Sequence, residues 1–222
     1  MGKIIVIDGT DCSGKETQAK RLFERLIDAN KKVVMYSFPM YDTPTGMIVG
    51  GPYLGKKHIS TGWFKEGANN VNPKVASLYY AADRLYNVEK IKKRLEQDYI
   101  VILDRYVTSN MGHQAGKIKD KEERMKMYRW LEKLEYDLLE LPKPDISIFL
   151  HMPYEFSKIL QGNRVELDEH ETSVDNITGA ELTYQEMSEL YNFITIECVK
   201  DNKLKTIDEI SNELYDKIID IL

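Results

Sequence analysis

The sequence predicts an α/β protein in which helices flank both faces of a five-stranded parallel sheet. Short apolar runs alternate with longer amphipathic stretches along all 222 residues, and strands that alternate with helices favour right-handed crossovers and a parallel sheet. The apolar runs are continuous in Val and Ile, as expected of strands that are buried on both faces. The length and composition suit a single domain spanning residues 1–222.

Five segments have the composition of buried strands. They are Lys3–Asp8, Val33–Phe38, Tyr99–Asp104, Ile146–Leu150 and Phe193–Val199. Four longer segments have the periodicity or the end signals of helices. They are Lys15–Ala29, the segment from Pro73 to about Gln97, Lys121–Leu141 and the segment after Thr206.

Recognisable signals mark the ends of these helices. Asn72 is a good N-cap, and Pro73 suits the first helical position. Thr206 and Glu209 have the spacing of a capping box, and prolines after Leu141 predict the end of the third helix.

Two stretches do not follow the strand–helix alternation. Residues 46–72 are rich in Gly and Asn, and residues 162–179 are acidic with one arginine. Loops this long are usually functional or mobile. We expect the second stretch to contain a short lid over about residues 162–176.

Composition excludes several classes of protein. The net charge of −5 argues against a general binder of nucleic-acid polymers, and no apolar run reaches the roughly 18 residues of a membrane helix. The two cysteines, Cys12 and Cys198, do not form a disulfide framework, which favours a cytoplasmic protein.

The first strand leads directly into a candidate phosphate-binding loop. Its residues are Gly9, Thr10, Asp11, Cys12, Ser13, Gly14, Lys15, Glu16 and Thr17. Glycines at both ends let the backbone N–H groups turn inward, and the following helix adds its positive end. Lys15 is placed to reach the β- and γ-phosphates of a nucleotide. We therefore expect a three-layer P-loop NTPase fold.

One position departs from the usual loop pattern. Glu16 stands where a Ser or Thr commonly ligates Mg²⁺, and Thr17 lies about 100° further around the helix. Glu16 either approaches Mg²⁺ through water or simply faces solvent in the first helical turn, where acids are favoured.

With these motifs in order, the chain resembles the thymidylate kinases. The residues that carry the resemblance are Gly9–Lys15, Phe38-Pro39, Leu78–Arg84 after Asn72-Pro73, Asp104–Ser109, His113–Gly116 and Asp168–Glu171. The resemblance implies that the chain phosphorylates dTMP to dTDP with ATP and Mg²⁺, a step toward dTTP. It also implies a homodimer, for which the helix with Tyr79 and the helix of Lys121–Leu141 offer apolar faces.

The resemblance also implies roles for individual residues. Arg105 would hold the dTMP phosphate, because a planar guanidinium grips phosphate through two hydrogen bonds. Tyr80 would stack on the thymine, and Arg84, one helical turn away, would donate to its O4. Asn110 would pair with the N3 edge. The remaining substrate-binding candidates are Phe38, Tyr41, Ser109, His113 and Gln114.

Metal and lid roles complete what the resemblance implies. Asp11 would accept from the sugar 3′-OH and help to place Mg²⁺, while Asp104 would order the metal's water shell or orient Arg105. Cys12 cannot supply the loop arginine of some relatives, so Arg164 would be the catalytic lid arginine. Asp168 and Glu171 match acidic lid positions near the acceptor sugar.

Two other interpretations remain open. Tyr41 stands where relatives commonly have arginine, and His113 where they have a larger aromatic residue. These differences allow another nucleoside monophosphate kinase or a deoxynucleoside kinase. Glu16 and the single lid arginine allow a nucleotide-binding regulatory protein with degenerate catalysis.

Overall fold

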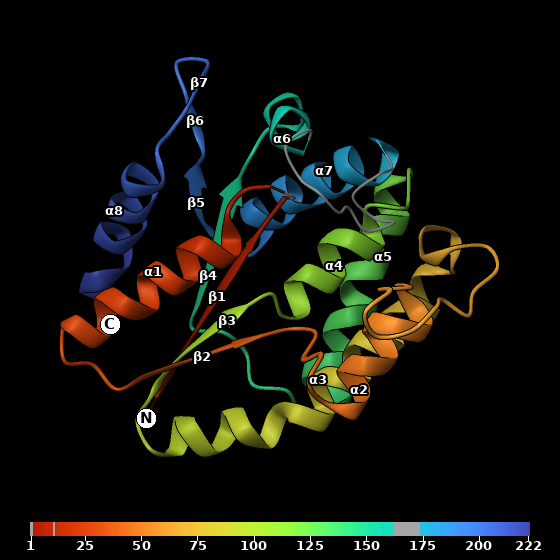
Figure 1. Ribbon diagram of the computed structural model, residues 1–222, viewed down its shortest axis with the longest axis horizontal. Helices are drawn as coiled ribbons and strands as arrows, with labels where there is room; N and C mark the ends of the chain where they lie inside the picture. Colours follow the sequence, from red (N-terminus) through yellow and green to blue (C-terminus); the bar gives the residue numbers. More distant parts are fainter. Residues whose placement is uncertain (1, 11, 162–173) are drawn as a thin grey trace.

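The computed structural model describes residues 2–10, 12–161 and 174–222. Its centre is a parallel five-stranded sheet of order β2-β3-β1-β4-β5, flanked by helices (Figure 1). The strands are β1 (Lys3–Gly9), β2 (Val33–Ser37), β3 (Ile100–Asp104), β4 (Ile146–His151) and β5 (Ile194–Glu197). Strands β2 and β3 lie on one side of β1, and β4 and β5, which follow them in the sequence, lie on the other. This arrangement confirms the expected fold class.

Successive residues of the central strand face opposite layers. Ile4 and Val6 of β1 belong to one buried cluster, whereas Ile5 and Ile7 belong to the other. All four are at most 1% exposed, which is why the strand reads as a continuous apolar run. Burial of apolar surface stabilises a fold by roughly 25 cal/mol for each Å² that is removed from water.

Helices form the two outer layers. One layer consists of α1 (Lys15–Asp28) and α8 (Ile207–Ile218), which pack together on the same face of the sheet (Figure 1). The opposite face is covered by α3 (Pro73–Glu96), α4 (Val107–Ala115), α5 (Lys121–Glu132) and α7 (Val174–Leu190). The shorter helices α2 (Pro44–Ile48) and α6 (Tyr154–Gln161) follow β2 and β4, respectively.

The expected helix caps are present. The Asn72 side chain accepts from the backbone N–H of Lys74, and Pro73 is the first residue of α3. Thr206 and Glu209 form the complete capping box of α8. These contacts satisfy backbone donors that otherwise have no partner at a helix N-terminus.

Two of the expected boundaries were wrong. The helix expected at Lys121–Leu141 changes at residue 133 into a π-helix, Lys133–Leu138. The strand expected at Phe193–Val199 ends at Glu197, because Val199 pairs instead in a small hairpin of β6 (Val199–Lys200) and β7 (Lys203–Leu204).

The two expected loops also contain helical structure. Residues 46–72 include the end of α2, a π-helix at Val49–Tyr53 and a 3-10 turn at Ala68–Asn70. They bury Tyr53, which stacks on Tyr79 of α3. In the second stretch, α7 begins at Val174, so the last residues assigned to the lid are helical, and residues 162–173 lie outside the described part.

Within the described residues, no helix is long and apolar enough to cross a membrane.

Candidate active site

The loop after β1 joins the middle of the sheet to α1. The Thr10 hydroxyl donates to the carbonyl of Met152 at 2.9 Å, and the Met152 N–H donates back at 3.2 Å. The thiol of Cys198 approaches the Ser13 carbonyl at 3.8 Å. These contacts tie the loop to the ends of β4 and β5. In open α/β sheets, ligands bind at the carboxyl ends of the strands where the strand order switches sides, and here this place is β1.

Two glycines of the loop are required for different reasons. A Cβ on Gly9 would lie 2.5 Å from the Leu150 carbonyl oxygen, so the close approach of β1 to β4 excludes a side chain. Gly14 has a φ of 78°, in the left-handed region that favours glycine. Gly14 is also the N-cap of α1, and no side chain of the described residues caps the first turn of this helix. The first-turn N–H groups and the helix dipole therefore suit an anion.

Lys15 is folded back over the loop. Its Nζ donates to the Thr10 carbonyl at 2.8 Å, and the residue is 7% exposed. A lysine held at the start of a helix beside inward-facing backbone donors provides a cation for phosphate oxygens.

The next two residues face solvent. Glu16 is exposed and pairs with Lys20 at 2.6 Å, one helical turn away. Thr17 is also exposed. This geometry favours the solvent-facing interpretation of Glu16.

Asp8 lies beneath the loop and was missed by sequence reasoning. It is 1% exposed, and its two carboxylate oxygens accept from the hydroxyls of Thr108 and Ser109. Burial raises the pKa of Asp8, although these hydrogen bonds and the nearby Arg105 and Lys15 oppose the increase. Ser109, a substrate-binding candidate, thus fastens α4 to β1. An acidic residue before the first loop glycine was the available sequence signal.

Strand β3, next to β1, ends at Asp104, and Arg105 follows it directly. The Ser37 hydroxyl donates to Asp104 Oδ2 at 3.2 Å, while the buried Oδ1 has no hydrogen-bond partner among the described residues. Arg105 has a φ of 68°, and its Nη1 lies 2.9 Å from Nε2 of His113. Because a guanidinium only donates, this histidine nitrogen is the acceptor. The structure thus brings two substrate-binding candidates, Arg105 and His113, into contact.

Tyr80 belongs to an aromatic cluster formed by α3 and residues 49–71. Its ring meets Tyr53 edge-on, with 5.7 Å between the ring centroids. Tyr79 lies in the same cluster, stacked on Tyr53 and edge-on to Phe64. The glycine- and asparagine-rich segment therefore supports the helix that carries Tyr80.

Arg84 is buried and makes an ion pair across to the segment after α5. It is 2% exposed, and its Nη2 donates to Oε1 of Glu135 at 2.7 Å while its Nε donates to Oε2. Its Nη1 donates to the Tyr106 carbonyl at 3.3 Å. Burial is the largest effect and opposes the charge of Arg84, but the attraction of Glu135 and the hydrogen bonds donated to it, together with Tyr106 and Tyr136, raise the arginine pKa above its ordinary value. Sequence reasoning found Arg84 but missed Glu135.

Asn110 and Gln114 lie one turn apart on α4, and Asn110 contacts this ion pair. Asn110 Nδ2 donates to Glu135 Oε1 at 3.0 Å and to the Ser77 carbonyl at 3.2 Å. The side-chain oxygens of Asn110 and Gln114 are buried and have no hydrogen-bond partner in the described part of the chain. Unpaired buried acceptors are costly in a folded protein, and they point to a ligand that donates.

The segment after β2 contains two substrate-binding candidates, Phe38 and Tyr41, which lie in different surroundings. Phe38 is buried against Tyr106, with 6.0 Å between ring centroids, and its bond to Pro39 is cis. The Lys56 ammonium lies 5.4 Å from the ring centroid of Tyr41. Asp83 accepts from the backbone N–H of Met40 at 2.9 Å and anchors this segment to α3.

Four candidates lie outside the described residues. They are Asp11, Arg164, Asp168 and Glu171.

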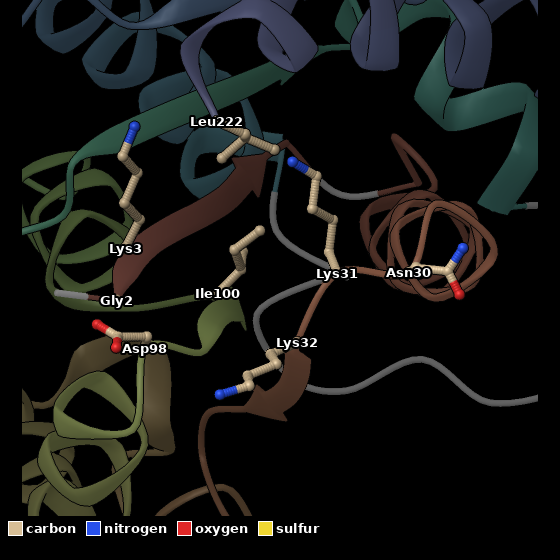
Figure 2. A pocket seen from close by; sticks show the side chains of 8 residues that line it. All are labelled: Gly2, Lys3, Asn30, Lys31, Lys32, Asp98, Ile100 and Leu222. Atoms are coloured by element: carbon tan, nitrogen blue, oxygen red, sulfur yellow. The ribbon is translucent and has the colours of Figure 1, made fainter.

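A surface pocket lies at the opposite edge of the sheet (Figure 2). Its lining includes Lys3, Lys32, Asp98 and Ile100, which belong to the amino-terminal ends of β1, β2 and β3 or lie next to them. None of the described candidate site residues lines it. Because parallel sheets bind ligands at their carboxyl ends, we do not assign the active site to this pocket.

The phosphate loop on a five-stranded parallel sheet, with arginines supplied from β3 and α3, defines a P-loop nucleotide-binding phosphotransferase. The thymidylate kinase family model matches residues 7–212. The chain therefore belongs to the thymidylate kinase family.

Individual relatives agree with this assignment over most of their lengths. A thymidylate kinase of Schizosaccharomyces pombe is 27% identical over 228 residues, which cover 100% of this chain and 97% of the relative. A probable thymidylate kinase of Thermococcus kodakarensis is 33% identical, covering 78% of this chain and 76% of its own. A solved thymidylate kinase from Candida albicans, described as having broad substrate specificity, has a TM-score of 0.71 at 25% identity. That match covers 99% of this chain and 92% of the Candida chain.

Proposed function

We propose that this chain transfers the γ-phosphoryl group of ATP to dTMP, forming ADP and dTDP. The observation that carries the proposal is the buried group of Arg84 on α3 and Asn110 and Gln114 on α4, the helix that packs against β1. Within the described part of the chain, two buried acceptors have no hydrogen-bond partner and Arg84 keeps donors that its contacts do not use, which suits a pyrimidine that has both a carbonyl and an N–H on one edge. Membership of the thymidylate kinase family supports the same substrate.

The transfer needs positioning and positive charge more than covalent catalysis. A 5′-phosphate oxygen of dTMP bonds to the γ-phosphorus while the bond from that phosphorus to the bridging oxygen breaks, and ADP keeps the electron pair. Lys15 would exchange the Thr10 carbonyl for phosphate oxygens. Arg105 would hold the dTMP phosphate, with His113 steadying its guanidinium. Arg164 stays a prediction for the cation that covers ATP.

Asp104 fits a role with Mg²⁺. Its buried Oδ1 has no hydrogen-bond partner among the described residues, and carboxylate oxygen is the kind of ligand that Mg²⁺ prefers. Asp104 would hold the ion through water, with Asp11 as the second candidate. When bound, Mg²⁺ neutralises charge on the phosphoryl oxygens.

For base recognition, Tyr80 would provide a stacking face, Arg84 a donor to O4, and Asn110 an acceptor for N3–H. Cytosine presents an amino donor in place of O4 and an acceptor at N3. Its amino group would therefore face the donors of Arg84, and its N3 would face the Asn110 oxygen, another acceptor. Sites built to hydrogen-bond one group reject analogues lacking it by a factor of about 10⁴ or more.

A homodimer in the cytoplasm is part of the proposal. Four apolar residues on α3 are 42–58% exposed, a pattern typical of an interaction surface. They are Val75, Leu78, Leu85 and Tyr86. Light scattering of the purified protein tests the dimer, and a monomer at all concentrations would contradict it.

An assay of ADP release with ATP, Mg²⁺ and a panel of acceptors tests the function. We expect turnover with dTMP and dUMP and scarcely any with dCMP, while UMP measures how far the site discriminates against a 2′-OH. Preferred turnover of thymidine would instead indicate a deoxynucleoside kinase. Tight binding of ATP and dTMP without ADP release would indicate a regulatory protein.

A further inference from the structure

We propose that Glu135 is a positioning residue that sets the base specificity of this chain, by holding both Arg84 and Asn110 in the orientations that fit a pyrimidine-2,4-dione. The proposal rests on the proposed function and adds a residue to it. Glu135 lies in the π-helix Lys133–Leu138 and is 0% exposed, so its carboxylate is withdrawn from solvent. Segments of π-helix are rare and are frequent at functional sites.

One carboxylate organises both base-reading side chains. Oε1 of Glu135 accepts from Arg84 Nη2 at 2.7 Å and from Asn110 Nδ2 at 3.0 Å, and Oε2 accepts from Arg84 Nε. The Tyr106 carbonyl takes one N–H of Arg84 Nη1. A guanidinium has five N–H donors, so each terminal nitrogen of Arg84 retains one donor that these contacts do not use.

Glu135 also decides which end of the Asn110 amide faces the site. Both neighbours of Nδ2, the Glu135 carboxylate and the Ser77 carbonyl, can only accept. If the amide were reversed, its oxygen would face the Glu135 carboxylate and the Ser77 carbonyl, which are both acceptors. The Asn110 oxygen therefore points away from these two groups, and it is buried without a hydrogen-bond partner among the described residues.

The resulting pattern distinguishes two kinds of pyrimidine. Arg84 offers donors and Asn110 offers an acceptor, which complements a carbonyl beside an imide N–H. Cytosine has an amino group and an unprotonated N3 at these places. In Glu135→Gln the Asn110 amide could reverse, because the amide nitrogen of the introduced side chain can donate to the Asn110 oxygen.

Stability alone is a weak reason for this ion pair. Replacing a buried ion pair by apolar residues is often neutral or stabilising. The pair also contacts the amide nitrogen of Asn110, whose side-chain oxygen is a candidate for reading the base. A role in specificity accounts for both observations.

The test compares the affinities for dTMP and dCMP of wild type and Glu135→Gln by calorimetry, together with KM and kcat for each nucleotide. We expect the dTMP-to-dCMP affinity ratio to fall at least tenfold in Glu135→Gln. The loss should appear in KM, with kcat within about threefold of wild type because the phosphate-binding residues are untouched. Glu135→Asp keeps the charge and should restore part of the ratio.

Glu186→Gln is the matched control. Glu186 pairs with Arg124 at 2.6 Å, between α7 and α5, and also accepts from Tyr128. These partners lie outside the base-reading group of Arg84, Asn110 and Gln114. This variant should lose thermal stability and keep the wild-type ratio.

An unchanged ratio in folded Glu135→Gln would overturn the inference, and so would an equal fall in Glu186→Gln. If Glu135→Gln does not fold, Glu135→Asp decides, because a wild-type dTMP-to-dCMP affinity ratio in that variant would equally contradict the inference. Wild type that binds neither nucleotide would overturn the proposed function itself, whereas normal discrimination without dependence on Glu135 would overturn only this inference.

Discussion

The two phosphate-loop glycines should respond differently to the same added methyl group. In Gly9→Ala, the new Cβ would lie 2.5 Å from the Leu150 carbonyl oxygen and 2.6 Å from Ser13 Oγ. The first of these atoms is backbone of a central strand and cannot move aside easily. Overpacking of this kind costs typically 1–3 kcal/mol, and we expect a cost of about 3 kcal/mol.

Gly14→Ala is the matched variant. No atom of the described residues lies within 4 Å of its ideal Cβ, so only the φ of 78° resists the substitution. A left-handed conformation costs a non-glycine residue roughly 1–2 kcal/mol. The expected cost in unfolding free energy is therefore clearly smaller than that of Gly9→Ala.

Thermal and urea unfolding measure both costs. For a chain of this size, 1 kcal/mol corresponds to about 2–4 °C in Tm, so Gly9→Ala should lower Tm by roughly 6–12 °C. A Gly9→Ala protein as stable as Gly14→Ala would refute the steric reasoning and the placement of the loop against β4.

Three further outcomes are expected. Lys15→Ala should abolish ADP release but keep the wild-type circular dichroism spectrum, because it removes a cation and no core group; normal turnover would exclude this lysine from the mechanism. Arg105→Lys should weaken dTMP affinity by about 10- to 150-fold, since an ammonium cannot grip phosphate bidentately; unchanged affinity would make Arg105 structural. Hydrogen bonds that His151 donates to the Glu181 carboxylate, and then to Glu197, raise its pKa above the ordinary 6.5 against the effect of burial. Its contribution to stability should be complete below about pH 6.5 and disappear as pH rises through the folded pKa. Urea unfolding across this range should therefore lose a pH-dependent component in His151→Gln, and an unchanged profile would contradict the assignment.

The sequence predicted the parts of the fold that have strong local signals. Continuous Val and Ile runs located the five strands, and Asn72 and Thr206 marked the starts of α3 and α8. The helices α4, α6 and α7 were not predicted. In α4 the apolar repeat is short, limited to Val107, Met111 and Ala115, and polar residues such as Thr108 and Asn110 are buried beside it, so the apolar signal is weak.

The candidate site was predictable where residues act through the backbone or through a recognisable motif. The phosphate loop and the Asp104-Arg105 pair are of this kind. Glu135 was not predictable, because an acid on an amphipathic helix normally faces solvent, and its partner Arg84 is 51 positions away. Asp8 lies in strand β1 directly before the first loop glycine, which was a usable signal, but its hydroxyl partners lie about 100 positions further along the chain and could not be foreseen.

The most direct test of the central claim is kcat/KM of the wild-type protein for dTMP and dCMP under identical conditions. The donors of Arg84 and the oriented amide of Asn110 predict a preference for dTMP by a factor of about 10⁴. Equal use of the two nucleotides would contradict the proposed recognition of a 2,4-dione and leave a broader pyrimidine kinase.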